Sequence, residues 1–412
     1  MKVRTRTLPG LTALDRQEWD ELTRGADTDA GYGYLRFREY LEPGESRVVA
    51  AYDRKGLAGA LHGALTTPRT AMTSNPWKFL AADSALRLGG ACARTAAEVR
   101  ARHRELVVAA GAPGDDGPLW QRLAARFGAA LVVRGFDRSL VRCRAGASPG
   151  ETGETTHALV RAAQQAALDA GAGAVAFPFV DPGDGVLRGV LDACGFRRGV
   201  VTAASLFRTG GCDSYDAFLG TLPGRYRRRH RVERQRLAES GLVTGELDVA
   251  ADAARMAELE AATLAKYGTT PDVDAIRRAR VELGTRQPHA VTVPAVERDG
   301  RVIACALHFV GRGSSLFLSY GCDYELADRS TSYAWTAFYH PIDRAVAAGR
   351  GAVRLGFEGF EAKTQRGATV HPREMWVWVP RAGDAERLGA LLEFLRRRNA
   401  GYLERFVKEP IP

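Results

Sequence analysis

The amino-acid sequence predicts a mixed α/β protein (α+β) made of two similar domains. Each half of the chain is expected to contain a β-hairpin followed by strands that alternate with helices, a pattern typical of mixed central sheets flanked by helices. A Gly-rich polar segment, 209–216, lies between an apolar strand and a new helix and marks the boundary. The 412 residues suffice for two or three domains. The predicted division is 1–208, 209–385 and a C-terminal helix and tail, 386–412.

In the first half, local signals mark where the elements begin. Asp15 is suited to cap the first helix, and residues 53–56 form the turn of the hairpin. The polar residues 145–154 are expected to form a loop before a long helix. The expected elements are a helix over 15–23, strands over 47–52, 57–65, 131–134 and 139–144, a helix over 155–170, a strand over 174–179, a helix over 185–194 and a strand over 200–207.

The second half is expected to repeat this order. Pro223 precedes an Arg-rich helix that ends near Ser240, and residues 298–300 form the turn of a second hairpin. The other expected elements are a helix that starts near 215, helices over 252–267 and 272–283, strands over 290–297, 301–310 and 315–321, a helix over 332–348 and strands over 353–357 and 375–379.

Composition excludes several classes of protein. The hydrophobic content of 45% is enough for full cores, and no apolar run reaches the roughly 18–20 residues that a membrane span needs. The start of the chain lacks an apolar signal core, so a soluble cytoplasmic protein is expected. None of the six cysteines forms a C-x-x-C pair, and the histidines form no H-x-H or H-E-x-x-H motif. The sequence therefore predicts neither a metal site nor a disulfide framework.

Two short motifs match enzyme signatures but lack the context that these require. Residues 146–150 fit G-x-S-x-G, yet the residue after Ser148 is Pro149, which has no N–H to contribute to an oxyanion hole. Residues 171–176 fit G-x-G-x-x-A, but these glycines end a helix and open a strand, the reverse of a dinucleotide-binding turn. We interpret both motifs as turns.

The strongest functional signal is the basic stretch 225–236. It holds seven arginines and one glutamate, a net charge of +6 within a chain whose total is +10. As a helix, this stretch would present a ridge of guanidinium groups suited to phosphate oxygens. Phosphate or RNA contact is therefore predicted for five of its residues: Arg225, Arg227, Arg228, Arg231 and Arg234. The alternative is a solvated helix whose arginines pair with acidic neighbours.

A second group of charged residues follows the strand expected at 353–357. Glu358, Lys363 and Arg366 lie in a glycine-punctuated loop, and loops that leave strand ends often carry the chemistry of α/β folds. Glu358 is predicted to orient the acceptor or accept an amine proton, and Lys363 and Arg366 to stabilise an oxyanion or phosphate. The alternative is a surface turn with solvated charges.

Three aromatic residues are candidates for substrate binding: Trp77 in the first half, and Tyr320 and Tyr333 in the second. The alternative is that they pack in the cores of the two domains.

The order of hairpin, strand and helix resembles the layout of the GNAT acyltransferase fold. Coenzyme A-dependent members would carry an R/Q-x-x-G-x-G/A loop that binds pyrophosphate through backbone amides. The first half instead has RAGASPGETGE, with a proline and two acidic residues. The second half has GCDYELADRSTS, with Asp323, Glu325 and Asp328. Both segments count against coenzyme A, and no cofactor is predicted.

The chain also resembles the FemAB-like, or BioF2-like, branch of the GNAT superfamily. The resemblance rests on the Arg-rich helix 225–237 with the preceding Tyr215-x-x-Phe218-Leu219, and on Gly356-Phe357-Glu358 with the later Lys363-x-x-x-Gly367. It implies twin GNAT-like domains and transfer of aminoacyl groups from aminoacyl-tRNA to an amine. Residues 252–283 are too short for the long helical arm of the cell-wall members, which favours a small acceptor.

The leading hypothesis is thus an aminoacyl-tRNA-dependent aminoacyltransferase that acts on the amine or hydroxylamine of a small molecule in natural-product biosynthesis, such as antibiotic biosynthesis. Two alternatives stay open: a GNAT N-acyltransferase that uses acyl-CoA or acyl-carrier protein, and a non-catalytic RNA-binding protein. Direct attack of a neutral amine on the donor ester would need no enzyme nucleophile, only positioning and oxyanion stabilisation. The oligomeric state is not predicted.

Overall fold

The computed structural model describes residues 3–25, 28–41, 44–82, 93–113, 117–327 and 329–407. The chain forms two compact units, each made of more than one segment. Unit 1 contains residues 1–24, 38–203 and 371–412, and unit 2 contains residues 25–37 and 204–370. Among the described residues, no helix is both long and apolar enough to cross a membrane.

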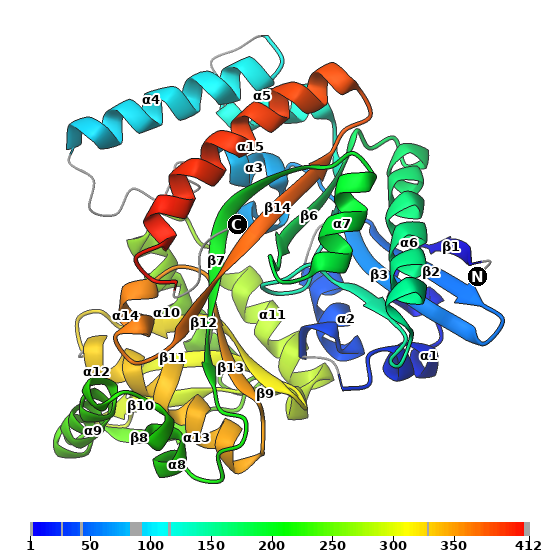
Figure 1. The fold of residues 1–412 in the computed structure, drawn as a ribbon. Coiled ribbons are helices and arrows are strands. Elements are labelled where there is room, and N and C mark those ends of the chain that lie inside the picture. The colour runs from blue at the N-terminus through cyan, green and yellow to red at the C-terminus, as the bar shows by residue number, and fades with distance from the viewer. Residues whose placement is uncertain are drawn as a thin grey trace. The chain divides into compact units, whose positions relative to one another are not determined.

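Unit 1 is a mixed sheet with helices packed on it (Figure 1). The strand order is β1-β2-β3-β4-β6-β14, with β5 beside β3; β4 and β6 are parallel. Helices α6 and α7 cover a core centred on Leu159, Phe177 and Trp376. The elements are β1 (Arg4–Leu8), α1 (Arg16–Leu22), β2 (Ser46–Asp53), β3 (Gly56–Leu65), α3 (Pro76–Ala81), α4 (Ala93–Ala110), α5 (Leu119–Phe127), β4 (Ala130–Val133), β5 (Val141–Cys143), α6 (Pro149–Asp169), β6 (Ala174–Val180), α7 (Gly185–Ala193), the first part of β7 (Arg197–Arg208), the last part of β14 (Thr369–Trp378) and α15 (Ala382–Leu403).

Unit 2 repeats this plan. The strand order is β7-β13-β12-β11-β10-β8, with β9 beside β11, and β12 and β13 form the parallel pair. Each unit thus has a hairpin, a helical crossover and one parallel pair, which confirms the predicted fold class of two tandem GNAT-like domains. The elements are α2 (Tyr32–Leu41), which ends in unit 1, α8 (Tyr215–Thr221), α9 (Gly224–Glu239), β8 (Val243–Glu246), α10 (Ala253–Lys266), α11 (Val273–Arg286), β9 (Val291–Thr292), β10 (Pro294–Arg298), β11 (Arg301–Val310), β12 (Ser314–Cys322), α12 (Arg329–Ala334), α13 (His340–Ala347), β13 (Ala352–Gly356) and α14 (Phe360–Thr364).

The prediction of a loop over 145–154 is wrong from residue 149 onward, because α6 begins at Pro149. Ser148 is the N-cap of α6: its side chain accepts a hydrogen bond from the backbone of Glu151, while the Glu151 carboxylate accepts one from the backbone of Ser148. This is the capping-box arrangement, with proline at the first helical position. The serine of the G-x-S-x-G match is therefore a helix cap.

The helix expected over 332–348 contains a π-helical turn, Trp335–Tyr339, between α12 and α13. His340 donates its backbone N–H to the carbonyl of Trp335, five residues earlier. The next donor in that pattern would be residue 341, which is a proline without an N–H. The sequence contains Pro341, but it does not predict the π-helical turn, which has one residue more than an α-helical turn.

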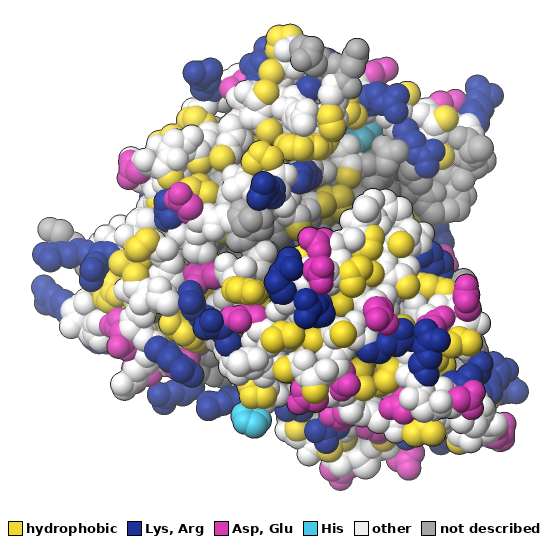
Figure 2. Space-filling model, turned by 180° about the vertical axis from the view of Figure 1, so that it is seen from behind, with side chains coloured by type: hydrophobic (Ala, Val, Ile, Leu, Met, Phe, Trp, Pro, Cys, Tyr) yellow, Lys and Arg dark blue, Asp and Glu magenta, His cyan; other side chains and the backbone are white. Residues whose placement is uncertain are grey.

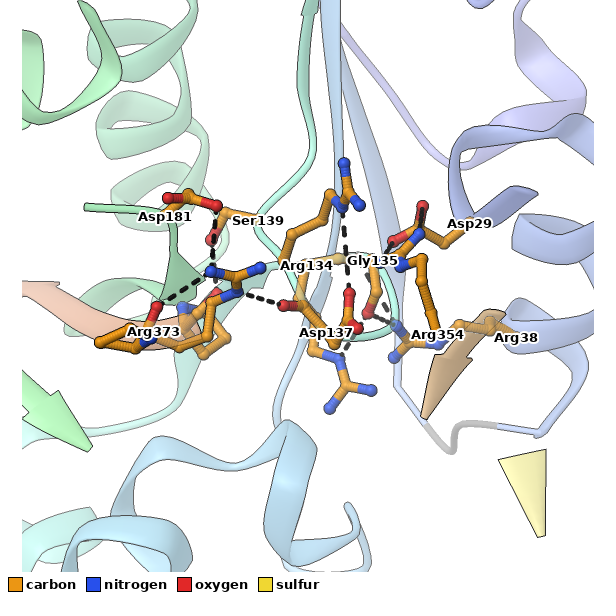
Figure 3. Close-up of polar contacts among 12 residues, drawn as sticks. Asp29, Arg38, Arg134, Gly135, Asp137, Ser139, Asp181, Arg354 and Arg373 are labelled. Carbon is orange, nitrogen blue, oxygen red and sulfur yellow. Dashed lines mark hydrogen bonds and ion pairs between the residues drawn. The ribbon is translucent and has the colours of Figure 1, made fainter. Parts of the chain in front are cut away.

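Two segments belong to a different unit from the one that their position in the sequence indicates. Residues 25–37 belong to unit 2, and residues 371–412 belong to unit 1. Within unit 2, Asp29 accepts hydrogen bonds from both terminal nitrogens of the buried Arg354, at 2.7 and 2.9 Å (Figure 3). Within unit 1, Asn399 of α15 donates to the carbonyl of Val200, so the predicted third segment, 386–412, is not separate from unit 1 where it is described.

Candidate active site

The candidate site lies in unit 2, where the parallel strands β12 and β13 separate. The two strands pair only over Ser314–Leu316 and Ala352–Arg354 among the described residues. Beyond this point, β12 continues along β11 and β13 along β7. The carboxyl ends of β12 and β13 are therefore not paired with each other. Such a gap in the strand pairing, at the carboxyl ends of parallel strands, is where α/β sheets commonly bind ligands.

The loop after β13 has an unusual backbone. Gly356, Glu358 and Gly359 all have positive φ angles, of 63°, 59° and 60°. Glycine adopts this region freely, but Glu358 does so at an energetic cost. The loop places the Glu358 side chain in solvent, at the carboxyl end of β13.

Lys363 of α14 holds this loop in place from inside. Its side chain is 3% exposed, and its ammonium donates hydrogen bonds to the carbonyls of Leu355 and Phe357, at 2.8 and 2.9 Å. Burial lowers the pKa of Lys363 to about 7, although the negative charge of Glu358 acts in the opposite direction. The amine is thus directed at backbone carbonyls rather than at solvent.

Arg366 forms a buried ion pair with Glu233 of α9. Its Nε and Nη2 lie 2.8 and 2.9 Å from the two carboxylate oxygens, and its Nη1 donates to the carbonyl of Ala362. Glu233 also accepts hydrogen bonds from Tyr339 and Arg229. Burial alone would raise the pKa of Glu233, but Tyr339 and Arg366 outweigh it and the pKa is lowered. The carboxylate is therefore charged, and Arg366 is already engaged as its partner.

His230 completes the attachment of α9. Its Nε2 is 2.8 Å from the carbonyl of Arg366, and its Nδ1 is 2.7 Å from the hydroxyl of Tyr215. A carbonyl only accepts hydrogen bonds, so Nε2 carries the proton and the tyrosine hydroxyl donates to Nδ1. Burial lowers the pKa of His230 to about 4, so the ring is neutral at pH 7. These contacts attach the inner face of the Arg-rich helix to the segment that carries Lys363 and Arg366.

The five arginines of α9 that were predicted to bind phosphate have three kinds of environment. Arg225, Arg228 and Arg231 are exposed, and the structure gives Arg228 and Arg231 no side-chain partner among the described residues. Arg227 donates to the carbonyl of Leu222. Arg234 instead pairs with Asp343 at 3.0 Å and lies over the ring of Tyr215. The prediction of phosphate contact therefore fits Arg228 and Arg231 best, whereas Arg234 has an intramolecular role.

The structure brings two of the three aromatic candidates together. The rings of Tyr320 and Tyr333 lie edge to face, with centroids 4.9 Å apart, and Tyr333 packs in the same way on Phe338, at 5.0 Å. The Arg366 guanidinium lies over the Phe338 ring, at 5.2 Å. Burial raises the pKa of Tyr333 to about 12, and burial, with the Cys322 thiol nearby, also raises that of Tyr320. Both phenols are protonated donors at neutral pH.

Trp77 does not belong to this group. It lies in unit 1 with 1% exposure, stacks on Phe127 and donates its indole N–H to the carbonyl of Gly128. Its side chain fills a core position, as the alternative interpretation expected.

Sequence reasoning missed a polar cluster in unit 1 (Figure 3). Strands β4 and β5 pair with neighbouring parts of the same edge of β3. Residues 134–140 connect these two strands. Arg373 donates to the carbonyl of Asp137 and pairs with Asp181 at 3.0 Å, and Arg38 donates to the carbonyl of Gly135. These arginines are far apart in the sequence, so spacing alone gives no signal for the cluster.

The structure describes most of the two segments whose sequences count against coenzyme A. In unit 1, the Glu151 carboxylate occupies the amino end of α6, and its hydrogen bond with Ser148 lowers its pKa. In unit 2, Asp323 pairs with Arg301 at 3.3 Å and Arg255 at 3.6 Å. Asp328 lies outside the described residues. Elsewhere, basic and acidic side chains intermingle on the face shown in Figure 2.

Comparison with known proteins identifies the family of the chain and solved structures with the same fold. Residues 143–408, more than half of the chain, match the FemAB-like family of peptidoglycan biosynthesis or recognition. This protein belongs to the FemAB-like family, and membership supports an aminoacyl transfer role. No curated protein matches the chain.

Two of the solved structures that match the chain illustrate the shared fold. FemX is 12% identical, with a TM-score of 0.59 over 94% of this chain and 99% of its own. A tandem GNAT protein from the clavulanic acid biosynthesis pathway is 13% identical, with a TM-score of 0.50 over 92% of this chain and 98% of its own. At these identities, the likeness concerns the fold alone.

Proposed function

We propose that this protein transfers an aminoacyl group from aminoacyl-tRNA to the amine or hydroxylamine of a small molecule in natural-product biosynthesis. The observation that carries the proposal is the position of α9. Its inner face is fixed through His230 and Glu233 to the segment of Lys363 and Arg366, while its outer face presents Arg225, Arg228 and Arg231 to solvent. A phosphate backbone bound to these arginines would lie beside the candidate site.

In the proposed reaction, the neutral acceptor amine attacks the carbonyl carbon of the donor ester. A new C–N bond forms, the ester C–O bond breaks, and the ribose hydroxyl of the tRNA leaves with the proton that the amine loses. Glu358 is the proposed carrier of that proton, because it is an exposed carboxylate at the carboxyl end of β13. No enzyme nucleophile is needed, since the ester is already activated.

The other charged residues take positioning roles in this proposal. Lys363 fixes the carbonyls of the loop that carries Glu358, and Arg366 fixes Glu233 and thus α9. Tyr320 and Tyr333 are proposed to contact the aminoacyl group or the acceptor at the gap between β12 and β13. Trp77 is omitted because it fills the core of the other unit.

The donor is tested by incubating the protein with charged tRNA or with acyl-CoA, each with candidate amines. Product is expected only with charged tRNA, and ribonuclease treatment of a parallel sample should abolish it. Product that forms from acyl-CoA, or survives ribonuclease, would favour the coenzyme A or carrier-protein alternative. RNA binding without acyl transfer from any donor would favour the non-catalytic alternative.

The double substitution R228A/R231A is expected to weaken tRNA binding and to flatten its salt dependence. Each lost phosphate contact should reduce the slope of log affinity against log salt by about 0.7–0.9. The measurement is a filter-binding or anisotropy titration between low and physiological salt. Arg278, an exposed arginine of α11, provides the matched control R278A, which should leave the slope unchanged. An unaltered slope in R228A/R231A would mean that these arginines are solvated surface charges that do not contact the RNA.

A further inference from the structure

A small cavity of about 10 Å³, room for one water-sized group, lies in unit 2 between α13 and strands β9, β11 and β12. The strand register pairs His308 with Thr292 and Val310 with Ser315. Side chains that face each other across paired strands project on the same side of the sheet. Thr292, His308 and Ser315 accordingly all line the cavity, and Pro341 and Ala345 of α13 cover it.

The cavity contains three polar atoms that lack a partner. Thr292 Oγ1, His308 Nδ1 and Ser315 Oγ are buried and make no hydrogen bond with any described residue. His308 is 1% exposed and Ser315 is 4% exposed. Native proteins rarely leave several such atoms together unless water or a ligand satisfies them.

The tautomer of His308 follows from the π-helical turn described above. His308 Nε2 is 3.0 Å from the carbonyl of Thr336, which lacks its helical donor because residue 341 is proline. Nε2 is therefore the protonated nitrogen, and Nδ1 offers a bare lone pair to the cavity. Burial lowers the pKa of His308 to about 3, so the ring stays neutral. The cavity therefore requires a hydrogen-bond donor.

A larger pocket of about 300 Å³ adjoins the cavity and shares Thr292, Arg344 and Arg350 with it. Arg350 donates to the carbonyls of Gly311 and Arg344. Among the described residues that line the pocket, Glu246 is the one carboxylate; it pairs with Arg344 at 3.4 Å and lies 2.9 Å from His340 Nε2. Burial and the nearby charge of Arg344 lower the pKa of Arg350. Because two arginines and one carboxylate line the pocket, it has an excess of positive charge.

We propose that this pocket binds a small carboxylate that carries a hydroxyl group. The carboxylate would lie in the pocket beside Arg344 and Arg350. The hydroxyl group would enter the adjoining water-sized cavity, which His308 lines, and donate to His308 Nδ1. A volume of about 300 Å³ is at the lower end of small-molecule sites. The pocket adjoins the amino ends of β12 and β13, whereas the candidate active site lies at their carboxyl ends. The two sites are separate, and this inference does not depend on the proposed aminoacyl transfer.

Malate and succinate form a matched pair of probes, because they differ by one hydroxyl group. Calorimetric titration of the full chain at low ionic strength is expected to give tighter binding of malate, on the order of tenfold, the effect of one hydrogen bond. In long-range ¹H–¹⁵N spectra, malate should shift the Nδ1 resonance of His308 and succinate should not. Equal affinities and an unshifted Nδ1 would overturn the role of His308.

The substitution R344Q/R350Q is expected to weaken malate binding at least tenfold, whereas R278Q removes an arginine elsewhere in unit 2 and should leave it unchanged. Equal losses in both variants would show non-specific charge attraction and overturn the site. If the wild-type protein binds neither probe at millimolar concentration, the cavity holds water alone and the proposal is wrong.

Discussion

Replacing Glu233 by glutamine is expected to lower the free energy of unfolding by about 3–5 kcal/mol, because the buried Arg366 guanidinium would lose its counter-charge. The two side chains form a bidentate pair, and both residues are at least nine-tenths buried. Urea denaturation at pH 7, followed by circular dichroism, measures the change. The same substitution at Glu239, which is exposed on α9 and accepts a hydrogen bond from Gln235, should cost less than about 0.5 kcal/mol.

A double variant separates the cost of an unpaired charge from that of lost packing. E233M/R366M replaces both partners with apolar side chains and should be more stable than E233Q, since no buried charge is left alone. If E233Q loses less than about 1 kcal/mol, or the double variant loses more than E233Q, the pair does not stabilise unit 2 in the way that the geometry indicates.

The second large effect concerns Lys363 and pH. The pKa of Lys363 is about 7 in the folded protein and near its ordinary value of 10.5 in the unfolded chain. Between these values the unfolded chain binds a proton that the folded protein lacks, so the free energy of unfolding rises with pH. Relative to K363M, the wild-type protein should gain about 1.4 kcal/mol per pH unit above pH 7, or about 3 kcal/mol by pH 9.5.

Below pH 7 the lysine is charged in both states, and the difference between wild type and K363M should become constant. Denaturation curves at half-unit steps from pH 5.5 to 9.5 test this, with K266M as the control for loss of an exposed lysine. A difference that stays flat throughout would mean that the neighbouring carbonyls of Leu355, Gly356 and Phe357 keep the ammonium charged. In that case Lys363 would not be the neutral amine that burial favours.

The candidate site could be predicted in part, because its residues cluster in the sequence. The basic helix and the loop of Glu358, Lys363 and Arg366 were both identified from local composition. The partner of Arg366 was not, because Glu233 is 133 residues away and was counted only as the single acid in a basic run. The unit 1 cluster around Arg373 gave no signal for the same reason.

The sequence by itself determined the elements that local physics specifies: the hairpins from their turns, the caps from Asp15 and Pro223, and the two similar α/β domains from the order of periodic segments. Only the tertiary structure decided which charges are free. Arg228 and Arg231 face solvent, whereas Arg234 and Arg366 pair with carboxylates brought from distant elements. The physical reason is that helix formation depends on neighbours in the sequence, while the burial and pairing of a charge depend on whichever side chains the fold places within a few ångströms.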